Sequence, residues 1–258
     1  MSFSIDWLDL REPADAAARD AGLIAELARW AGGRDPVVLD LGSGTGSSYR
    51  ALAQQIGGRW TLTDIDASLL DEAVRRHGGE AGFAGLRRLD LVAGLEEVLA
   101  AQRPDIVTGS ALIDLASADW LDRLAAALPR HAALYMALSY DGVEHWHPAP
   151  PAEAAGHAAF LTHQRRDKGF GPALGPDAAA HLADALRARG WEVSLARSDW
   201  RLNDGQRALI TALADGAAEA VAETGALAPE TLEDWRAARR SADRVTVGHL
   251  DLLALPRP

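Results

Sequence analysis

The sequence predicts an α/β fold in which helices cover both faces of a mostly parallel sheet. Short apolar runs that fit buried strands alternate with stretches of helical periodicity along most of the chain. The first run leads into a glycine-rich turn that opens a helix. Acidic residues then stand at the ends of three successive strands, at Asp40, Asp64 and Asp90. Because parallel strands share one carboxyl edge, we expect the turn and the acids to border one crevice.

The first element is a helix that precedes any strand. Pro13 stands where a helix can begin, and Gly32 and Gly33 end the pattern. Apolar residues between them recur at helical spacing and predict one buried face: Ala17, Leu23, Ile24, Leu27 and Trp30. We therefore expect residues 1–33 to form an N-terminal helix.

Residues 37–41 predict a short buried strand, and the turn GSGTG follows at residues 42–46. Its glycines lack a Cβ, so backbone amides can approach a ligand closely. A dinucleotide site needs G-x-G-x-x-G, but Ser47 stands where that pattern has its last glycine. The carboxylate of Asp40 would repel a pyrophosphate and would suit a ligand that carries an ammonium and a sulfonium group. The turn therefore favours a cationic nucleoside without phosphates.

Two further strands end in acids. The strand predicted at residues 60–66 carries Asp64, 20 residues after Gly44, where a carboxylate can accept both hydroxyls of a ribose. Asp66 is more simply interpreted as the N-cap of the next helix. The strand predicted at residues 86–91 carries Asp90 near its end.

These residues resemble motif I and the following strand ends of the class I S-adenosylmethionine (SAM) dependent methyltransferases, over roughly the first 140 residues. The resemblance implies a Rossmann-like three-layer sandwich with a mostly parallel seven-stranded sheet whose last strand is antiparallel. It also implies methyltransferase activity (EC 2.1.1.-), with SAM as cofactor and S-adenosyl-L-homocysteine as product.

The resemblance further implies roles for individual residues. Asp40 and the glycine turn would hold the methionine part of SAM, Asp64 the ribose, and Asp90 the adenine amino group. The leading helix would cover the pocket, where Arg11 or Arg19 could pair with the SAM carboxylate through a bidentate fork; alternatively, Arg19 is a solvated helix residue. The expected cofactor-binding set is Arg19, Asp40, Gly42, Ser43, Gly44, Gly46, Asp64, Ile65, Asp90, Leu91 and Ser110.

The fourth strand, predicted at residues 105–110, should end beside the same crevice. Asp114 is the first acid after it and could act as a general base or as an anchor for a substrate ammonium group. The alternative is that Asp114 or Ser117 caps the helix predicted over residues 118–128.

A segment at residues 140–175 follows the fifth strand, which is predicted over 131–139. It has a proline-rich start and a predicted helix over residues 152–166. Because it leaves the carboxyl end of a strand, it could close over the crevice as a helical lid. The candidate catalytic residues here are Tyr140, His145 and His163, since a histidine with a near-neutral pKa can remove a proton from an attacking N or O.

Two other features of this segment have competing interpretations. His145 and His147 could supply two metal ligands, with His157 or His163 as a third, but no acid or Cys completes a site at a recognised spacing, so we expect no metal. The basic run at residues 164–168 could neutralise a carboxylate or phosphate on the substrate. It could equally be a solvated helix end, where cations favour the helix dipole.

The remaining chain continues the α/β pattern. A helix is predicted over residues 176–189 and a strand over 191–196. Two helices, over 209–224 and 229–240, indicate a helical insert at residues 203–242, before a last strand at 245–255.

Composition excludes several classes of function. A chain of 258 residues can bury one large core and is expected to form a single domain. It has no Cys, which excludes thiolate nucleophiles, Cys-ligated zinc and disulfides. The formal net charge of −11 opposes a nucleic-acid partner and favours a small-molecule substrate. With neither a signal-peptide pattern nor a long apolar run, we expect a cytoplasmic monomer or homodimer that has no membrane partner.

The resulting hypothesis is a methyl transfer from SAM to an N, O or other nucleophile of a small molecule, most like the trans-aconitate or ubiquinone-pathway methyltransferases. A SAM-binding cyclase or lyase would keep the same anchors, as would a noncatalytic SAM-binding protein. A nicotinamide oxidoreductase is supported by the glycine turn alone.

Overall fold

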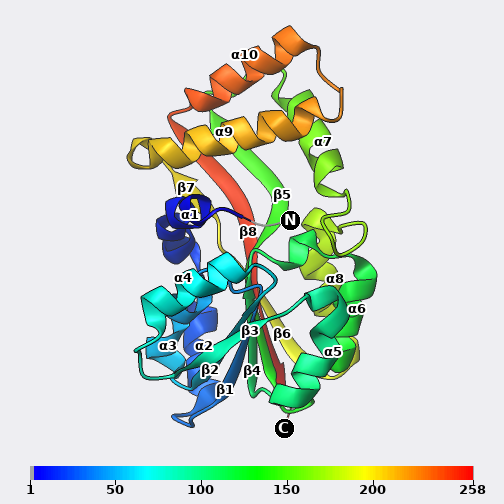
Figure 1. Cartoon of the computed structure of the whole chain (residues 1–258). Coiled ribbons are helices and arrows are strands. Elements are labelled where there is room, and N and C mark those ends of the chain that lie inside the picture. The colour runs from blue at the N-terminus through cyan, green and yellow to red at the C-terminus, as the bar shows by residue number, and fades with distance from the viewer. Residues whose placement is uncertain (1–2, 258) are drawn as a thin grey trace.

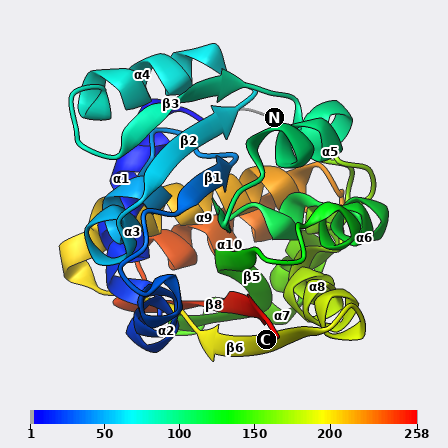
Figure 2. The ribbon, with the colours of Figure 1, turned by 90° about the horizontal axis from the view of Figure 1, so that it is seen from below.

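The computed structural model describes residues 3–257, and its centre is an eight-stranded sheet. The strand order is β3-β2-β1-β4-β5-β8-β6, with the short β7 paired to β8 (Figures 1 and 2). β1 to β5 are parallel to one another, and β8 is antiparallel to β5, β6 and β7. The predicted mostly parallel sheet with an antiparallel last strand is confirmed. The strands are β1 (Val37–Leu41), β2 (Arg59–Asp64), β3 (Phe83–Arg88), β4 (Ile106–Ser110), β5 (Ala133–His147), β6 (Trp191–Arg197), β7 (Trp200–Leu202) and β8 (Arg244–Pro256).

Helices cover both faces of the sheet and form the outer layers of a sandwich (Figure 1). One face carries α2 (Ala21–Ala31), α3 (Ser47–Ile56) and α4 (Ala67–His77). The other carries α5 (Leu91–Gln102), α6 (Ala118–Ala127) and α8 (Ala178–Ala188). Each layer has its own apolar core against the sheet, with Trp60 buried on the first face and Trp120 on the second. None of the helices within residues 3–257 is both long and apolar enough to cross a membrane.

The leading segment is two helices where one was predicted. α1 (Ile5–Ala18) ends at Arg19, and Asp20 caps α2 by accepting a hydrogen bond from the Leu23 amide at 2.8 Å. The Asp20 amide donates to the buried carboxylate of Asp251 on β8, at 2.9 Å. A continuous helix would use that amide internally. The spacing of apolar residues did not reveal this break, because the apolar residues of α2 continue the helical pattern that begins in α1.

β5 extends further than predicted. It does not end at Ser139 but bends at Leu138 (φ +57°) and runs on to His147. β8, with 13 residues against 15 in β5, is nearly as long and pairs with the extension, for example Tyr140 with His249. Residues 140–147 of the expected lid are therefore strand, and the helical part begins at α7 (Glu153–Gln164).

The extended β5 and β8 carry a separate helical layer at the carboxyl edge of the sheet (Figure 1). It contains α7, from the predicted lid segment, and α9 (Arg207–Ala222) and α10 (Pro229–Arg240). The last two confirm the two helices predicted between residues 203 and 242. Arg239 is fully buried in this layer between the rings of Trp146 and Trp235, with its guanidinium carbon 4.4 and 4.1 Å from the ring centres. It forms ion pairs with Glu144 on β5, at 2.9 Å, and with Glu153 on α7. One buried cation thus joins three elements of this layer.

Candidate functional site

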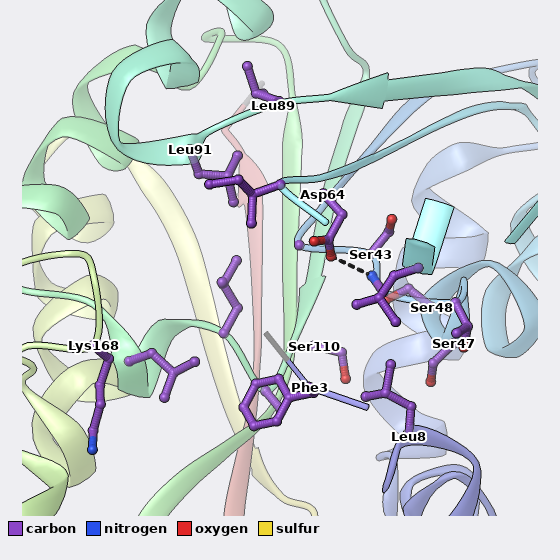
Figure 3. A pocket seen from close by; sticks show the side chains of 18 of the residues that line it. Phe3, Leu8, Ser43, Ser47, Ser48, Asp64, Leu89, Leu91, Ser110 and Lys168 are labelled. Carbon is purple, nitrogen blue, oxygen red and sulfur yellow. Dashed lines mark hydrogen bonds between the residues drawn. The ribbon is translucent and has the colours of Figure 1, made fainter. Parts of the chain in front are cut away.

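A cavity of about 230 Å³ lies at the carboxyl ends of β1, β2 and β4, between the sheet and α1 (Figure 3). The glycine turn, the β2 and β3 ends and the segment after β4 form one side. α1 and the loop at residues 168–170 form the other. Eight of the predicted cofactor-binding residues line it: Gly42, Ser43, Gly44, Asp64, Ile65, Asp90, Leu91 and Ser110.

The glycine turn has the backbone that the sequence requires. Gly42 and Gly44 have φ values of +60° and +54°, in the left-handed region that favours glycine. A Cβ on Gly44 would also lie 3.1 Å from the Leu8 side chain of α1. Gly46 does not line the cavity; it precedes α3 and packs against His77.

Asp64 is nine-tenths buried at the end of β2 and faces the cavity (Figure 3). One carboxylate oxygen accepts from the Gly44 amide at 2.9 Å, and the other accepts from the Asp66 amide at 2.9 Å. These bonds fix the carboxylate and leave further lone pairs for hydroxyl donors. Asp66 caps α4, accepting from the Ser68 amide at 2.8 Å, as predicted.

Asp90 lines the cavity from a different local structure than expected. β3 ends at Arg88, so Asp90 and Leu91 do not belong to the strand. Asp90 is the N-cap of α5 and accepts from the Val92 amide at 2.8 Å. The predicted strand was too long, because Leu89 and Leu91 are apolar like strand residues and so the prediction included the capping residue Asp90.

Asp40 lies behind the glycine turn and does not line the cavity. It is fully buried, and its Oδ1 accepts from the Thr108 hydroxyl at 2.7 Å. Burial raises the pKa of this carboxyl to about 6, against the opposing effect of the Thr108 hydrogen bond. Its Oδ2 has no hydrogen-bond partner within residues 3–257. This acceptor is therefore buried at the end of β1, beside the turn.

Arg19 is buried rather than solvated, so the exposed-helix alternative is wrong. Its Nη2 donates to the hydroxyls of Ser110, at 3.0 Å, and Ser47, at 3.2 Å, both of which line the cavity. Nε and Nη1 are buried and have no partner in the described part of the chain. Arg11 lines the cavity, but Asp15 already neutralises it through two hydrogen bonds of 2.9 and 3.1 Å.

The four predicted catalytic residues, Asp114, Tyr140, His145 and His163, do not line the cavity. Asp114 lies half-buried in the short helix η1 (Ile113–Leu115), where burial raises the pKa of its carboxyl to about 6. Its Oδ1 is without a partner among the described residues. Ser117, not Asp114, caps α6 by accepting from the Trp120 amide at 3.3 Å.

Tyr140 and His145 lie on the β5 extension, away from the cavity. The Tyr140 hydroxyl donates to Glu144 at 3.1 Å and is 3.2 Å from Nε2 of His157. His145 is exposed on the strand. Among residues 3–257, no group of three His, Cys, Asp or Glu side chains is arranged to hold a metal ion.

The cavity also contains residues that the sequence analysis did not select. Phe3 precedes α1, Leu8 lies on α1, and Lys168 follows α7 (Figure 3). Phe170 lies in the same loop as Lys168. The chain offered one signal for them. Lys168 is the only lysine in the sequence, within the basic run that we considered for a substrate anion.

No protein-family model matches the chain, and no curated protein matches it significantly. Its structure is similar to solved structures of low sequence identity. A protein from Bacillus halodurans proposed to be a methyltransferase has a TM-score of 0.55 at 14% identity, over 91% of this chain and 99% of that chain. The YcgJ protein from Bacillus subtilis has a TM-score of 0.53 at 9% identity, over 93% and 100%.

A SAM-dependent methyltransferase from Thiobacillus denitrificans, in complex with S-adenosyl-L-homocysteine, has a TM-score of 0.51 at 19% identity and covers 100% of both chains. At these identities the similarity establishes the fold alone. The chain has the Rossmann-like fold of class I SAM-dependent methyltransferases.

Proposed function

We propose that this chain, with its class I methyltransferase fold, binds SAM in the cavity and transfers the methyl group to a small molecule. One observation carries the proposal. The glycine turn separates a cavity-facing carboxylate, Asp64, from a buried pair of opposite charges, Arg19 and Asp40, which both keep unpartnered polar atoms. This arrangement is complementary to a nucleoside that carries an amino-acid zwitterion and no phosphate.

The residues present fit the parts of SAM. The Asp64 carboxylate would accept from the ribose hydroxyls, and Asp90 from the adenine amino group. At the other end, the free N–H groups of Arg19 and the hydroxyls of Ser47 and Ser110 would hold the methionine carboxylate. The unpartnered oxygen of Asp40 would favour the ammonium group. When bound, SAM supplies an electrophilic methyl group on a sulfonium.

The chain itself contributes positioning and the exclusion of water. Leu8 of α1 and Phe3, which precedes α1, cover the cavity, and Glu12 of α1 forms an ion pair with Arg50 on α3. A second ion pair joins Asp9 of α1 to Arg76 of α4, at 2.7 Å. These contacts hold α1 against the sheet domain, so that an acceptor and the methyl donor share a shielded space.

Calorimetric titration with SAM and S-adenosyl-L-homocysteine tests cofactor binding, with NADH as the comparison ligand. A metabolite extract supplied with a deuterated methyl donor tests the transfer. We expect binding of both SAM compounds, no NADH binding, and a deuterium-labelled product. Loss of the label from SAM without a methylated product would instead indicate a cyclase or lyase. Tight NADH binding without SAM binding would contradict the proposal.

A further inference from the structure

The wall of the cavity opposite Ser43 and Ser47 contains the chain's only lysine (Figure 3). Three cationic side chains line the cavity. Arg11 is paired with Asp15, and Arg50 with Glu12. Lys168 differs from both, because no ion pair joins its Nζ to a carboxylate of residues 3–257; the charge of Glu223, which pairs with His163 and Arg166, acts on it from farther away. One positive charge at the cavity wall thus has no direct ion-pair partner.

The contacts of Lys168 hold its ammonium group and leave donors free. Nζ lies 3.4 Å from Nδ1 of His163, and Nε2 of His163 lies 3.1 Å from Glu223. An ammonium N–H can donate to Nδ1 only if the imidazole proton is on Nε2, which then donates to Glu223. Burial and Lys168 both lower the pKa of His163, which favours this neutral form. Two of the three N–H donors of Lys168 remain for a ligand.

The backbone around Lys168 is a constrained loop. Asp167 accepts hydrogen bonds from the amides of Gly169, at 2.7 Å, and Gly171, at 3.0 Å. Phe170 packs edge-on against Trp120 of α6, with the ring centres 5.2 Å apart. These contacts present Lys168 and Phe170 together to the cavity. Lys168, at the edge of the cavity, and Phe170 therefore come from one constrained loop (Figure 3).

The rest of the acceptor side is mostly apolar. Beyond the groups assigned to SAM, the lining includes the apolar side chains of Phe3, Leu8, Leu115 and Phe170. Its polar members are Lys168, Thr45, Ser48 and two ion pairs, Arg11 with Asp15 and Arg50 with Glu12. Desolvation lowers the pKa of Lys168, because removing water destabilises its charged form. A bound anion would offset this free-energy cost. An ammonium-bearing acceptor would meet repulsion instead, since Asp114 lies outside the cavity lining.

We propose that Lys168, held by His163 and Glu223, anchors the anionic group of the methyl acceptor, which is a small carboxylic acid with an apolar or aromatic body. That the bound acid is the methyl acceptor rests on the proposed function. The anion site itself depends only on the loop at residues 168–170 and the cavity. His163 and Glu223 are positioning residues, because they act through Lys168.

The single lysine makes a direct test possible. Protein grown with isotope-labelled lysine gives one side-chain NMR signal, which belongs to Lys168. With S-adenosyl-L-homocysteine present, benzoate and hexanoate are each titrated beside their neutral amides, benzamide and hexanamide. We expect the two acids to shift the Lys168 signal saturably and the amides to leave it in place. Equal shifts by acids and amides, or no shift by either acid, would overturn the inference.

Two variants separate the anchor from a general charge effect. Lys168→Met should abolish the rise in melting temperature that the acids produce, and Lys168→Arg should keep part of it. Arg187→Met is the matched control, because Arg187 is exposed, pairs with Asp184 at 3.2 Å and does not line the cavity; it should respond like the wild type. An unchanged acid response in Lys168→Met contradicts the anchor. Repeating the titrations without S-adenosyl-L-homocysteine keeps this test independent of SAM binding.

Discussion

Asp64 and Gly44, 20 residues apart in the sequence, are joined by a hydrogen bond of 2.9 Å from the Gly44 amide to Oδ2 of Asp64. The bond ties the end of β2 to the glycine turn of β1. The carboxylate that would bind the ribose therefore also fixes the turn that would face the methionine end. The two halves of the candidate SAM site depend on each other through this contact.

Asp64→Ala should weaken the binding of S-adenosyl-L-homocysteine by tenfold or more, since a lost charge-assisted hydrogen bond is worth about 1.5–3 kcal/mol. Calorimetry measures this directly. Asp66→Ala is the control: it removes a helix cap, at a cost of about 1 kcal/mol in unfolding free energy, and should leave affinity unchanged. Equal affinities of Asp64→Ala and the wild type would refute the ribose assignment.

Arg19→Met should weaken S-adenosyl-L-homocysteine binding but not the binding of 5′-methylthioadenosine, which lacks the amino-acid portion. The physical reason is that Arg19, which does not line the cavity itself, contacts Ser47 and Ser110 at the end assigned to the methionine carboxylate. Arg29→Met on the exposed face of α2 serves as the control and should bind both ligands normally. A similar loss for both ligands would show that Arg19 supports the fold rather than the carboxylate.

Asp40 should make the free protein less stable as the pH rises. Its pKa is about 6 in the folded state against 3.8 for the ordinary group, so the folded state holds the proton more tightly. The ionisation of Asp40 does not change the unfolding free energy below about pH 4. Above pH 6 it lowers the unfolding free energy by about 3 kcal/mol, since each pKa unit corresponds to about 1.36 kcal/mol. Asp40→Asn should remove this loss.

Urea unfolding of the wild type and Asp40→Asn at pH 4.5 and 7.5 measures the difference. The unfolding free energy of Asp40→Asn, relative to the wild type, should be higher at pH 7.5 than at pH 4.5. Its affinity for SAM should fall. A pH-independent difference between the two proteins is the opposing result.

Arg239→Met should lower the unfolding free energy by about 3 kcal/mol, because it leaves Glu144 and Glu153 as buried or half-buried charges without their partner. Arg240→Met is the neighbouring control; its side chain is half-exposed, and its ion pair with Asp215 is 3.6 Å long, so the change should stay within about 0.5 kcal/mol. Thermal and urea unfolding measure both. Equal stabilities of the two variants would contradict the bracing role of Arg239.

The sequence predicted the sheet and the cofactor side of the cavity because both depend on local signals. Strand hydrophobicity, the left-handed glycines and acids at strand ends are each visible within a few residues. The break between α1 and α2 was not visible, because it depends on Asp251, more than 200 residues away. The extension of β5 likewise requires β8 as its partner.

The acceptor side was predicted less well for the same reason. Tyr140 and His145 were selected because they follow a strand end, but the strand continues through them and carries them away from the cavity. His163 was selected for its chemistry, and the structure places it behind Lys168, which does line the cavity. Which side chains of the loop at residues 168–170 line the cavity is decided by tertiary packing that no local pattern contains.

The most direct test of the central claim is calorimetric titration of the wild-type protein with S-adenosyl-L-homocysteine, with NADH as the comparison. A SAM site in this cavity predicts saturable binding of one S-adenosyl-L-homocysteine per chain and no heat from NADH. Binding of NADH in its place, or the absence of any binding by S-adenosyl-L-homocysteine, would contradict it.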